Sequence, residues 1–200
     1  MGYSNRRNCK RFYITGLWGP SAATLNDKSE DILRNNSQTI FTAGIAGGLS
    51  LERNRGRLRV EAEWLQRDYF ESQTVFGPTA NVIAINNWSV LTNVWRDFMF
   101  TNRFGCYGGG GIGAGGLRLG ETSTGQTVFD NASTAFAWQA GGGLIYEISD
   151  QVTFDASYRW YQLGDFPVSG GGLNTDDFNF AASQIMFSIR VFEPLRSLLR

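Results

Sequence analysis

Residues 57–64 read Arg-Leu-Arg-Val-Glu-Ala-Glu-Trp, an octet in which charged and apolar side chains alternate strictly. Because successive side chains of a β-strand point to opposite faces, the octet predicts a strand with one charged and one apolar face. The charged face carries the arginines and glutamates, and the apolar face carries Leu58, Val60, Ala62 and Trp64. The octet alone leaves open which of the two faces lies inside the protein.

Eight segments of the chain carry strand patterns, most of them with the same alternation. They cover residues 11–19, 39–51, 57–69, 88–98, 104–119, 135–148, 152–163 and 178–192. Most of them reach the ~9–11 residues that a tilted strand needs to cross a bilayer. No apolar run approaches the ~20 residues of a spanning helix. If the chain crosses a membrane, it therefore crosses with strands.

The connections between these segments alternate between long and short. The short ones are 52–56, 99–103 and 149–151, whereas the long ones have about 14–20 residues. This alternation is typical of outer-membrane barrels, which have short periplasmic turns and long outer loops, and a soluble barrel has no need of it. The sequence predicts an all-β fold, an eight-stranded antiparallel up-and-down transmembrane β-barrel. Residues 1–10 are expected to form a periplasmic segment, 11–192 the barrel, and 193–200 a short periplasmic tail.

One set of alternating side chains is charged and points into the predicted barrel. The set is Arg59, Glu61, Glu63, Arg67, Asp97, Glu147, Asp155, Arg159 and Arg190. The interior of a small barrel is just wide enough for side chains to fill it. We therefore expect a structural network of paired charges, in which Arg159 neutralises carboxylates such as Asp155. The alternative is a narrow ion-conducting path through the same charges.

The opposite set of side chains is rich in large aromatic residues. On the predicted register, Trp18, Trp64, Trp88, Trp138, Tyr146, Tyr158 and Trp160 face outward. Aromatic side chains of barrels gather at the two bilayer interfaces. We expect these seven residues to anchor the barrel in the membrane.

The charges divide unevenly between the two ends of the predicted barrel. The long connections contain nine acidic residues and two basic ones. The termini and short turns, counted with Arg11 and Arg57 at the adjoining strand ends, contain ten basic and three acidic ones. An acidic outer end disfavours nucleic acid and sulfated glycans, which require clustered cations. It favours a basic protein patch, or divalent ions that bridge to lipopolysaccharide, with Asp165, Asp176 and Asp177 as candidate recognition residues. The alternative is that acidic loops merely keep the surface soluble.

Several chemistries are excluded or disfavoured by the composition. The chain contains no histidine, so mechanisms that depend on an imidazole are absent. No Cys–His spacing suggests zinc, and we expect no metal or cofactor. The glycine run 108–116 matches a dinucleotide fingerprint, but 117–122 show no helical period, so a barrel strand is favoured. Cys9 and Cys106 are expected to be free thiols.

Four strings resemble strands of the small outer-membrane β-barrel family, which includes opacity-type surface antigens and OmpA-like and OmpX-like barrels. They are Asn-Val-Trp-Arg-Asp-Phe at 93–98, Tyr-Gly-Gly-Gly-Gly-Ile-Gly at 107–113, Ala-Trp-Gln-Ala-Gly-Gly-Gly at 137–143 and Asp-Ala-Ser-Tyr-Arg-Trp at 155–160. The resemblance implies an integral protein of a Gram-negative outer membrane, surrounded by lipid and lipopolysaccharide.

The same resemblance specifies the fold better than a function, because members do unlike jobs on one scaffold. Enzymes of similar architecture use histidine, so a non-enzymatic structural or surface-recognition role is expected here. The chain departs from the family pattern at its end, where eight residues follow the aromatic Phe192.

Overall fold

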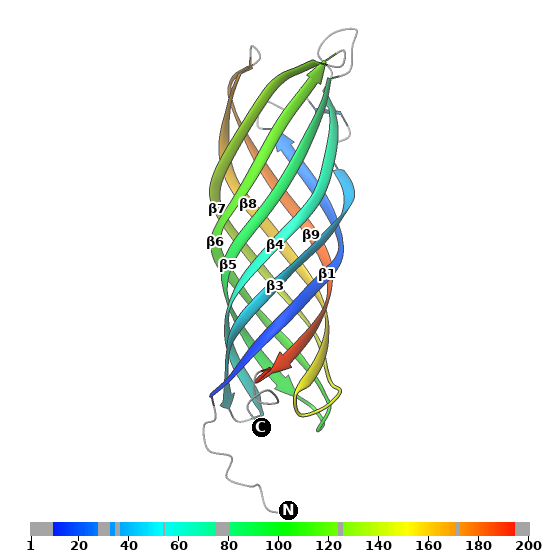
Figure 1. Ribbon diagram of the computed structural model, residues 1–200, viewed down its shortest axis with the longest axis vertical. Helices are drawn as coiled ribbons and strands as arrows, with labels where there is room; N and C mark the ends of the chain where they lie inside the picture. The colour runs from blue at the N-terminus through cyan, green and yellow to red at the C-terminus, as the bar shows by residue number, and fades with distance from the viewer. Residues whose placement is uncertain are drawn as a thin grey trace, which may run out of the picture.

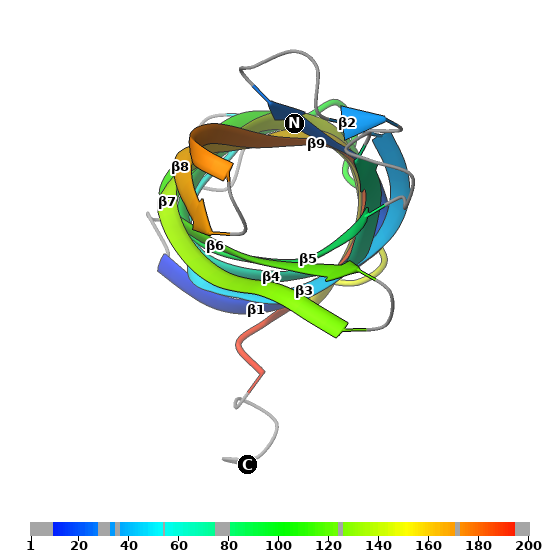
Figure 2. The same ribbon diagram turned by 90° about the horizontal axis from the view of Figure 1, so that it is seen from above.

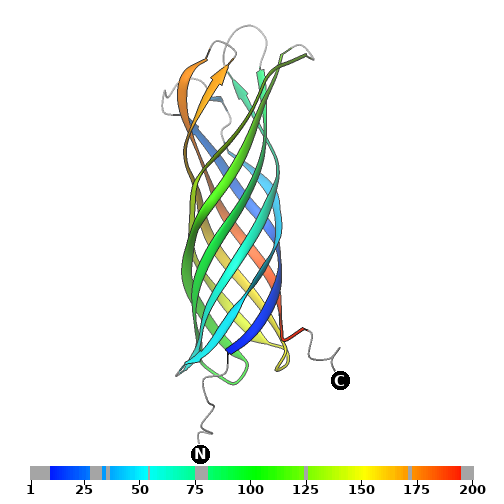
Figure 3. The same ribbon diagram turned by 60° about the vertical axis from the view of Figure 1, so that its left-hand side comes forward.

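The computed structural model describes residues 10–27, 33–34, 37–53, 55–74, 81–123, 126–170 and 173–194. They form a closed barrel of strongly tilted strands around one axis (Figures 1 and 2). Figure 3 shows the same tilt from another side. Among these residues, no helix has the length and apolarity to cross a membrane.

The barrel wall consists of eight strands, each antiparallel to its neighbours. They are β1 (Lys10–Asp27), β3 (Ser37–Arg53), β4 (Gly56–Thr74), β5 (Asn81–Met99), β6 (Phe104–Ser123), β7 (Gln126–Glu147), β8 (Val152–Gly170) and β9 (Leu173–Phe192). Neighbours in sequence pair with each other, and pairing of β1 with β9 closes the ring. The two-residue β2 (Leu33–Arg34) adds to β4. The predicted fold class is confirmed.

The strands are much longer than the predicted segments, with 17 to 22 residues each. The added residues lie at the end of the barrel opposite the three short turns. There, 164–177 were expected to be a loop, but Val168 pairs with Asp176 and Gly170 with Leu173 in a β8–β9 hairpin. A ladder needs only backbone groups, so strands can continue where polar residues no longer alternate with apolar ones. We call the end with the short turns the turn end, and the other the far end.

A β-bulge in β4 changes which side chains point inward. Arg67 pairs with Asn87 and Phe70 with Ile85, so two residues of β4 oppose one residue of β5. Both Arg67 and Phe70 are therefore buried inside the barrel, although three positions separate them.

Glycines on β6 and β7 make room for large side chains from the facing strands. A Cβ added at Gly111 would overlap the side chain of Asn93, and one added at Gly109 would contact the Trp95 ring at 2.9 Å. On β7, a Cβ at Gly141 would lie 3.0 Å from Cγ of Arg159. The glycine-rich stretch 108–116 lies in β6, which pairs with β5 on one side and with β7 on the other.

Candidate functional site

The lumen contains a band of buried charges. Eight of the nine predicted lumen residues have at most 4% of their surface exposed, namely Arg59, Glu61, Glu63, Arg67, Asp97, Asp155, Arg159 and Arg190. They come from β4, β5, β8 and β9. The ninth, Glu147, is partly exposed at the turn end of β7. The eight buried residues are four arginines and four carboxylates, so their formal charges cancel.

Four of these residues form a continuous chain of ion pairs across four strands. Arg59 donates from Nε to Oδ1 and Oδ2 of Asp97, at 2.9 and 3.1 Å. Asp97 Oδ2 lies 3.7 Å from Nη1 of Arg190, whose Nη2 donates to Asp155 at 2.6 Å. Each carboxylate is thus held by at least one guanidinium, as burial of charge requires.

A second buried pair crosses the lumen from β8 to β4. Arg159 Nη1 donates to Glu63 Oε2 at 2.6 Å. The other Glu63 oxygen accepts from Gln139 Nε2 at 2.7 Å. Asp155, named from the sequence as a partner of Arg159, instead binds Arg190. Asp155 and Arg159 lie on one strand four positions apart, roughly 13 Å at ~3.3 Å per residue, whereas Glu63 faces Arg159 across the barrel.

Glu61 is held by two aromatic residues that the sequence did not single out. The Tyr13 hydroxyl donates to Oε2 and the Trp95 indole Nε1 to Oε1, each at 2.7 Å. Arg59 Nη1 lies 3.6 Å from the same carboxylate. Tyr13 and Trp95 are fully buried. Both lie on inward positions, so alternation placed them in the lumen, but it did not indicate their role as donors.

Arg67 lies apart from the other lumen arginines and bonds to neutral groups. Its Nη1 donates to Asn87 Oδ1 at 2.9 Å and to Ser89 Oγ at 3.0 Å. Its guanidinium stacks over the Tyr161 ring, with 3.6 Å from Cζ to the ring centroid. A cation–π contact of this kind partly replaces a carboxylate.

An apolar layer fills the lumen between the charged band and the far end. It consists of Ala23, Leu25, Ile40, Phe70, Leu91, Leu117, Ala137, Tyr161, Leu163, Phe180 and Ala182. All eight strands of the barrel wall contribute to this layer. Phe180 packs edge-on against both Phe70 and Tyr161, with centroids 6.3 Å apart in each case. Leu25, Leu163 and Phe180 have no measurable exposure. Every residue of this layer is at most 5% exposed, so the layer is closely packed.

The mouth of the lumen at the turn end is closed by Phe192. Its ring is buried against Tyr13, with centroids 5.6 Å apart, and the guanidiniums of Arg11 and Arg57 lie over it at 4.8 and 5.2 Å. Arg57 also pairs with Glu147 at 2.6 Å. Glu147 therefore belongs to the rim of the mouth and not to the buried band.

The comparison with protein families agrees with this architecture. The family model described as "Outer membrane protein beta-barrel domain" matches residues 5–190. The chain belongs to this family. The expected resemblance and the location in a Gram-negative outer membrane are thereby confirmed, so the turn end is periplasmic and the far end is extracellular.

This outer-membrane barrel is also similar to individual known proteins. The outer membrane protein PagN of Salmonella typhimurium is 25% identical over 182 residues, covering 78% of this chain and 76% of PagN. Neisserial surface protein A has a TM-score of 0.53 at 18% identity, covering 90% of this chain and 96% of its own. Ail of Yersinia pestis, crystallised with the heparin analogue sucrose octasulfate, has a TM-score of 0.49 at 17% identity, covering 90% and 98%. At these identities, the solved structures show likeness of fold alone.

The seven predicted anchors all lie on the outer wall of this membrane barrel. Six are 36–55% exposed, and Tyr146 is partly covered by Phe104, with ring centroids 4.7 Å apart. On β4 the next outward position beyond Trp64 is Gln66, and on β8 the next outward position beyond Trp160 is Gln162. Trp64 and Trp160 therefore lie near the extracellular limit of the apolar wall on these two strands. Phe12, Phe98, Phe100 and Phe104, which the sequence analysis did not select, are exposed aromatic residues at the periplasmic side.

The three candidate recognition residues lie on strands and not on a free loop. Asp165 belongs to β8 and is exposed. Asp176 and Asp177 belong to β9, where only their backbones are described, opposite Val168 and Pro167. The prediction of a long last loop was wrong at these positions, because the hairpin ladder continues past the membrane.

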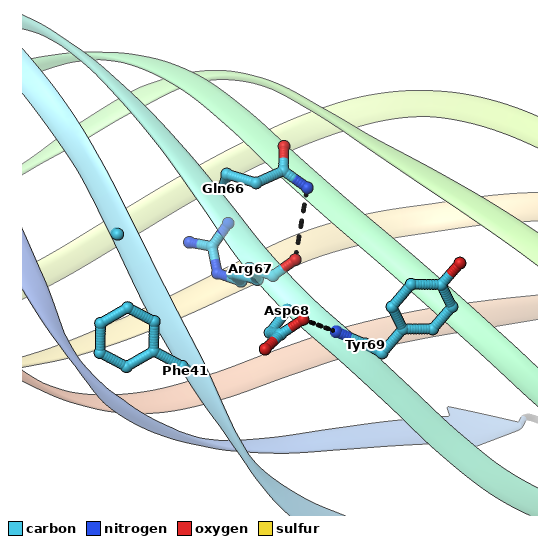
Figure 4. Close-up of a pocket in the computed structure, with 6 residues that line it drawn as sticks. Phe41, Gln66, Arg67, Asp68 and Tyr69 are labelled. Carbon is cyan, nitrogen blue, oxygen red and sulfur yellow. Dashed lines mark hydrogen bonds between the residues drawn. The ribbon is translucent and has the colours of Figure 1, made fainter.

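The outer wall also carries a shallow hollow beside the β4 bulge (Figure 4). Phe41 of β3 and Tyr69 of β4 line it, together with Gln66, whose Nε2 donates to the Arg67 carbonyl at 3.3 Å. Asp68 accepts from the Tyr69 backbone N–H at 2.8 Å, which stabilises the bulge. The hollow is open to the surroundings and contains no cluster of reactive groups.

Two further sequence-based expectations concern metals and thiols. Within the described part of the chain, no three His, Cys, Asp or Glu side chains come together to hold a metal ion. Cys106 of β6 has a free thiol, and Cys9 lies outside the described residues.

Proposed function

We propose that this protein is a closed, non-enzymatic outer-membrane barrel that presents acidic groups at its extracellular end to a cationic partner. The observation that carries the proposal is the placement of acidic residues at the extracellular ends of six strands. They are Asp27 of β1, Glu71 of β4, Glu121 of β6, Asp130 of β7, Asp165 of β8, and Asp176 and Asp177 of β9. We call this set the acidic crown.

Residues of the acidic crown lie on paired strands, unlike charges on free loops. Asp130 pairs with Gly120, Glu121 with Phe129 and Asp177 with Pro167, so these backbones have fixed positions. Binding to residues on an ordered backbone costs less conformational entropy than binding that must order a loop. The partner that fits is a basic protein patch, or divalent ions that bridge to lipopolysaccharide phosphates.

Binding of a polycation tests the proposed role of the acidic crown. Purified barrel should bind immobilised poly-lysine, and binding should weaken with added salt because exposed charges are screened beyond ~8–10 Å. The double variant Asp176→Asn, Asp177→Asn should bind more weakly, whereas Asp150→Asn, at an exposed acidic position on the periplasmic β7–β8 turn, should not. Tight, salt-sensitive binding to immobilised heparin would contradict the proposal.

The buried carboxylates support a structural role over an enzymatic one. Glu61, Glu63, Asp97 and Asp155 are each at most 4% exposed and each accept bonds from neighbouring side chains. A general acid or base must come within hydrogen-bonding reach of its substrate, and no substrate reaches these groups. The chain also lacks histidine, which similar barrel enzymes use.

The closed lumen predicts that the barrel does not conduct ions. Ions would have to cross both the apolar layer around Phe180 and the paired charges below it, and the residues of both regions are at most 5% exposed. In planar bilayers, wild-type protein should therefore give no stable current steps. Insertion is checked by the shift in gel mobility on heating. Reproducible conductance that changes in Arg159→Ala would favour the alternative of a narrow pore.

A further inference from the structure

The periplasmic end presents three exposed arginines on two adjacent turns. Arg53 ends β3, Arg55 lies in the β3–β4 turn that follows, and Arg103 lies in the β5–β6 turn. We call these three residues the arginine rim. None of them makes an ion pair with another described residue, unlike Arg57, which pairs with Glu52 at 3.2 Å and with Glu147 at 2.6 Å.

The two turns of the arginine rim are joined and well ordered by hydrogen bonds. The Met99 backbone N–H donates to the Arg55 carbonyl at 3.1 Å. Within the β5–β6 turn, the Thr101 hydroxyl accepts from the backbone N–H groups of Arg103 at 3.2 Å and Phe104 at 2.9 Å. The positions from which the three guanidiniums extend are therefore fixed relative to one another.

Exposed aromatic residues place the arginine rim at the surface of the bilayer. Phe98, the last residue but one of β5, is 47% exposed, and Phe104, the first residue of β6, is 56% exposed, both on the outer wall. Phe100, in the turn between them, is 70% exposed. Aromatic residues of barrels gather where the apolar wall meets the lipid headgroups. The guanidiniums of the arginine rim lie next to this boundary between the apolar wall and the headgroups. The groups within their reach are therefore lipid headgroups of the inner leaflet.

We propose that the arginine rim binds the phosphates of anionic phospholipids in the inner leaflet of the outer membrane. Guanidinium groups bind phosphate oxygens through paired, charge-assisted hydrogen bonds. The acyl chains of the same lipid lie along Phe98 and Phe104. The nearby carboxylates do not neutralise the positive charge of the arginine rim. Glu52 and Glu147 form ion pairs with Arg57. The exposed Asp150 lies on a different turn, between β7 and β8.

Lipid retention measured by native mass spectrometry tests this proposal. Full-length folded protein in a non-ionic detergent is mixed with equal amounts of phosphatidylglycerol and phosphatidylcholine of identical acyl chains. Wild type should retain phosphatidylglycerol preferentially. The triple variant Arg53→Gln, Arg55→Asn, Arg103→Gln should lose this preference, by up to about fivefold for each charge removed. Asparagine is chosen at position 55 because Arg55 has a positive φ of 62°, which asparagine tolerates.

The controls separate a local site from a general effect of charge. Arg118→Gln removes an exposed arginine from β6 toward the extracellular side and should leave the preference unchanged. Heat-dependent gel mobility shows whether each variant is folded. If the triple variant does not fold, the test is whether salt reduces the preference of wild type for phosphatidylglycerol. Addition of 0.5 M NaCl should reduce it, because salt screens a contact between guanidinium and phosphate. Equal retention of both lipids by wild type, an unchanged preference in the folded triple variant, or binding only to peptidoglycan fragments would overturn the proposal.

Discussion

The Arg159→Ala variant is expected to be about 3–5 kcal/mol less stable than wild type, because it leaves a buried carboxylate without its cation. Arg159 donates to Glu63 at 2.6 Å, and both side chains are almost fully buried. Urea unfolding of vesicle-inserted protein, followed by the fluorescence of the six tryptophans, measures the difference.

A double-mutant cycle distinguishes loss of the ion pair from loss of packing. Glu63→Ala should destabilise by a similar amount, and the double variant should cost less than the two single variants together. A coupling of about 0.5–3 kcal/mol is expected for groups in direct contact. Arg103→Ala, at an exposed position in the β5–β6 turn where its side chain makes no ion pair with another described residue, should change stability by about 0.5 kcal/mol or less. If the free-energy costs of the two single variants add up to the cost of the double variant, Arg159 and Glu63 do not stabilise the barrel as an interacting pair.

The Phe180→Ala variant is expected to be destabilised by about 3–5 kcal/mol, through loss of buried surface and creation of a cavity. Phe180 is fully buried in the apolar layer and contacts the rings of Phe70 and Tyr161. Residues on several strands close the layer, so the gap cannot be filled by movement of one side chain. The same urea titration measures this loss.

The matched control for Phe180→Ala removes a phenylalanine from the outer wall. Phe136 of β7 is 59% exposed, so lipid or detergent can occupy the space left by Phe136→Ala. Its cost should therefore be clearly smaller than that of Phe180→Ala. Equal costs would show that the interior layer is not tightly packed in the membrane.

The local alternation of polar and apolar residues predicted, for most positions, whether a side chain points into the lumen or lies on the outer wall. Glu63 is buried in the lumen, and its neighbour Trp64 is on the outer wall, as the octet 57–64 indicates. The backbone geometry of a strand sets this alternation without regard to tertiary contacts. The bilayer strengthens the signal, because lipid requires apolar side chains along one whole face. For the same reason, the eight-stranded membrane barrel could be predicted, and the family comparison confirms it.

The same signal weakens beyond the membrane, where both faces of a strand can be polar. The sequence therefore placed Asp176 and Asp177 in a loop, whereas their backbones belong to the β8–β9 hairpin. The bulge after Arg67 also escaped prediction, and it turns Phe70 into the lumen. Backbone pairing continues there because hydrogen bonds between neighbouring strands do not depend on an apolar face.

The sequence by itself determined the strand alternation, the inward charges and the outward aromatic residues, because each follows from the two-residue repeat of a strand. Only the tertiary structure decided which charge meets which. Arg159 and Glu63 are 96 residues apart in sequence and meet across the closed lumen, whereas Asp155 on the same strand is directed to Arg190. The apolar layer that closes the extracellular half likewise depends on side chains from all eight wall strands, which converge at one level. Such convergence follows from the strand register and the closure of β1 on β9, which no local pattern encodes.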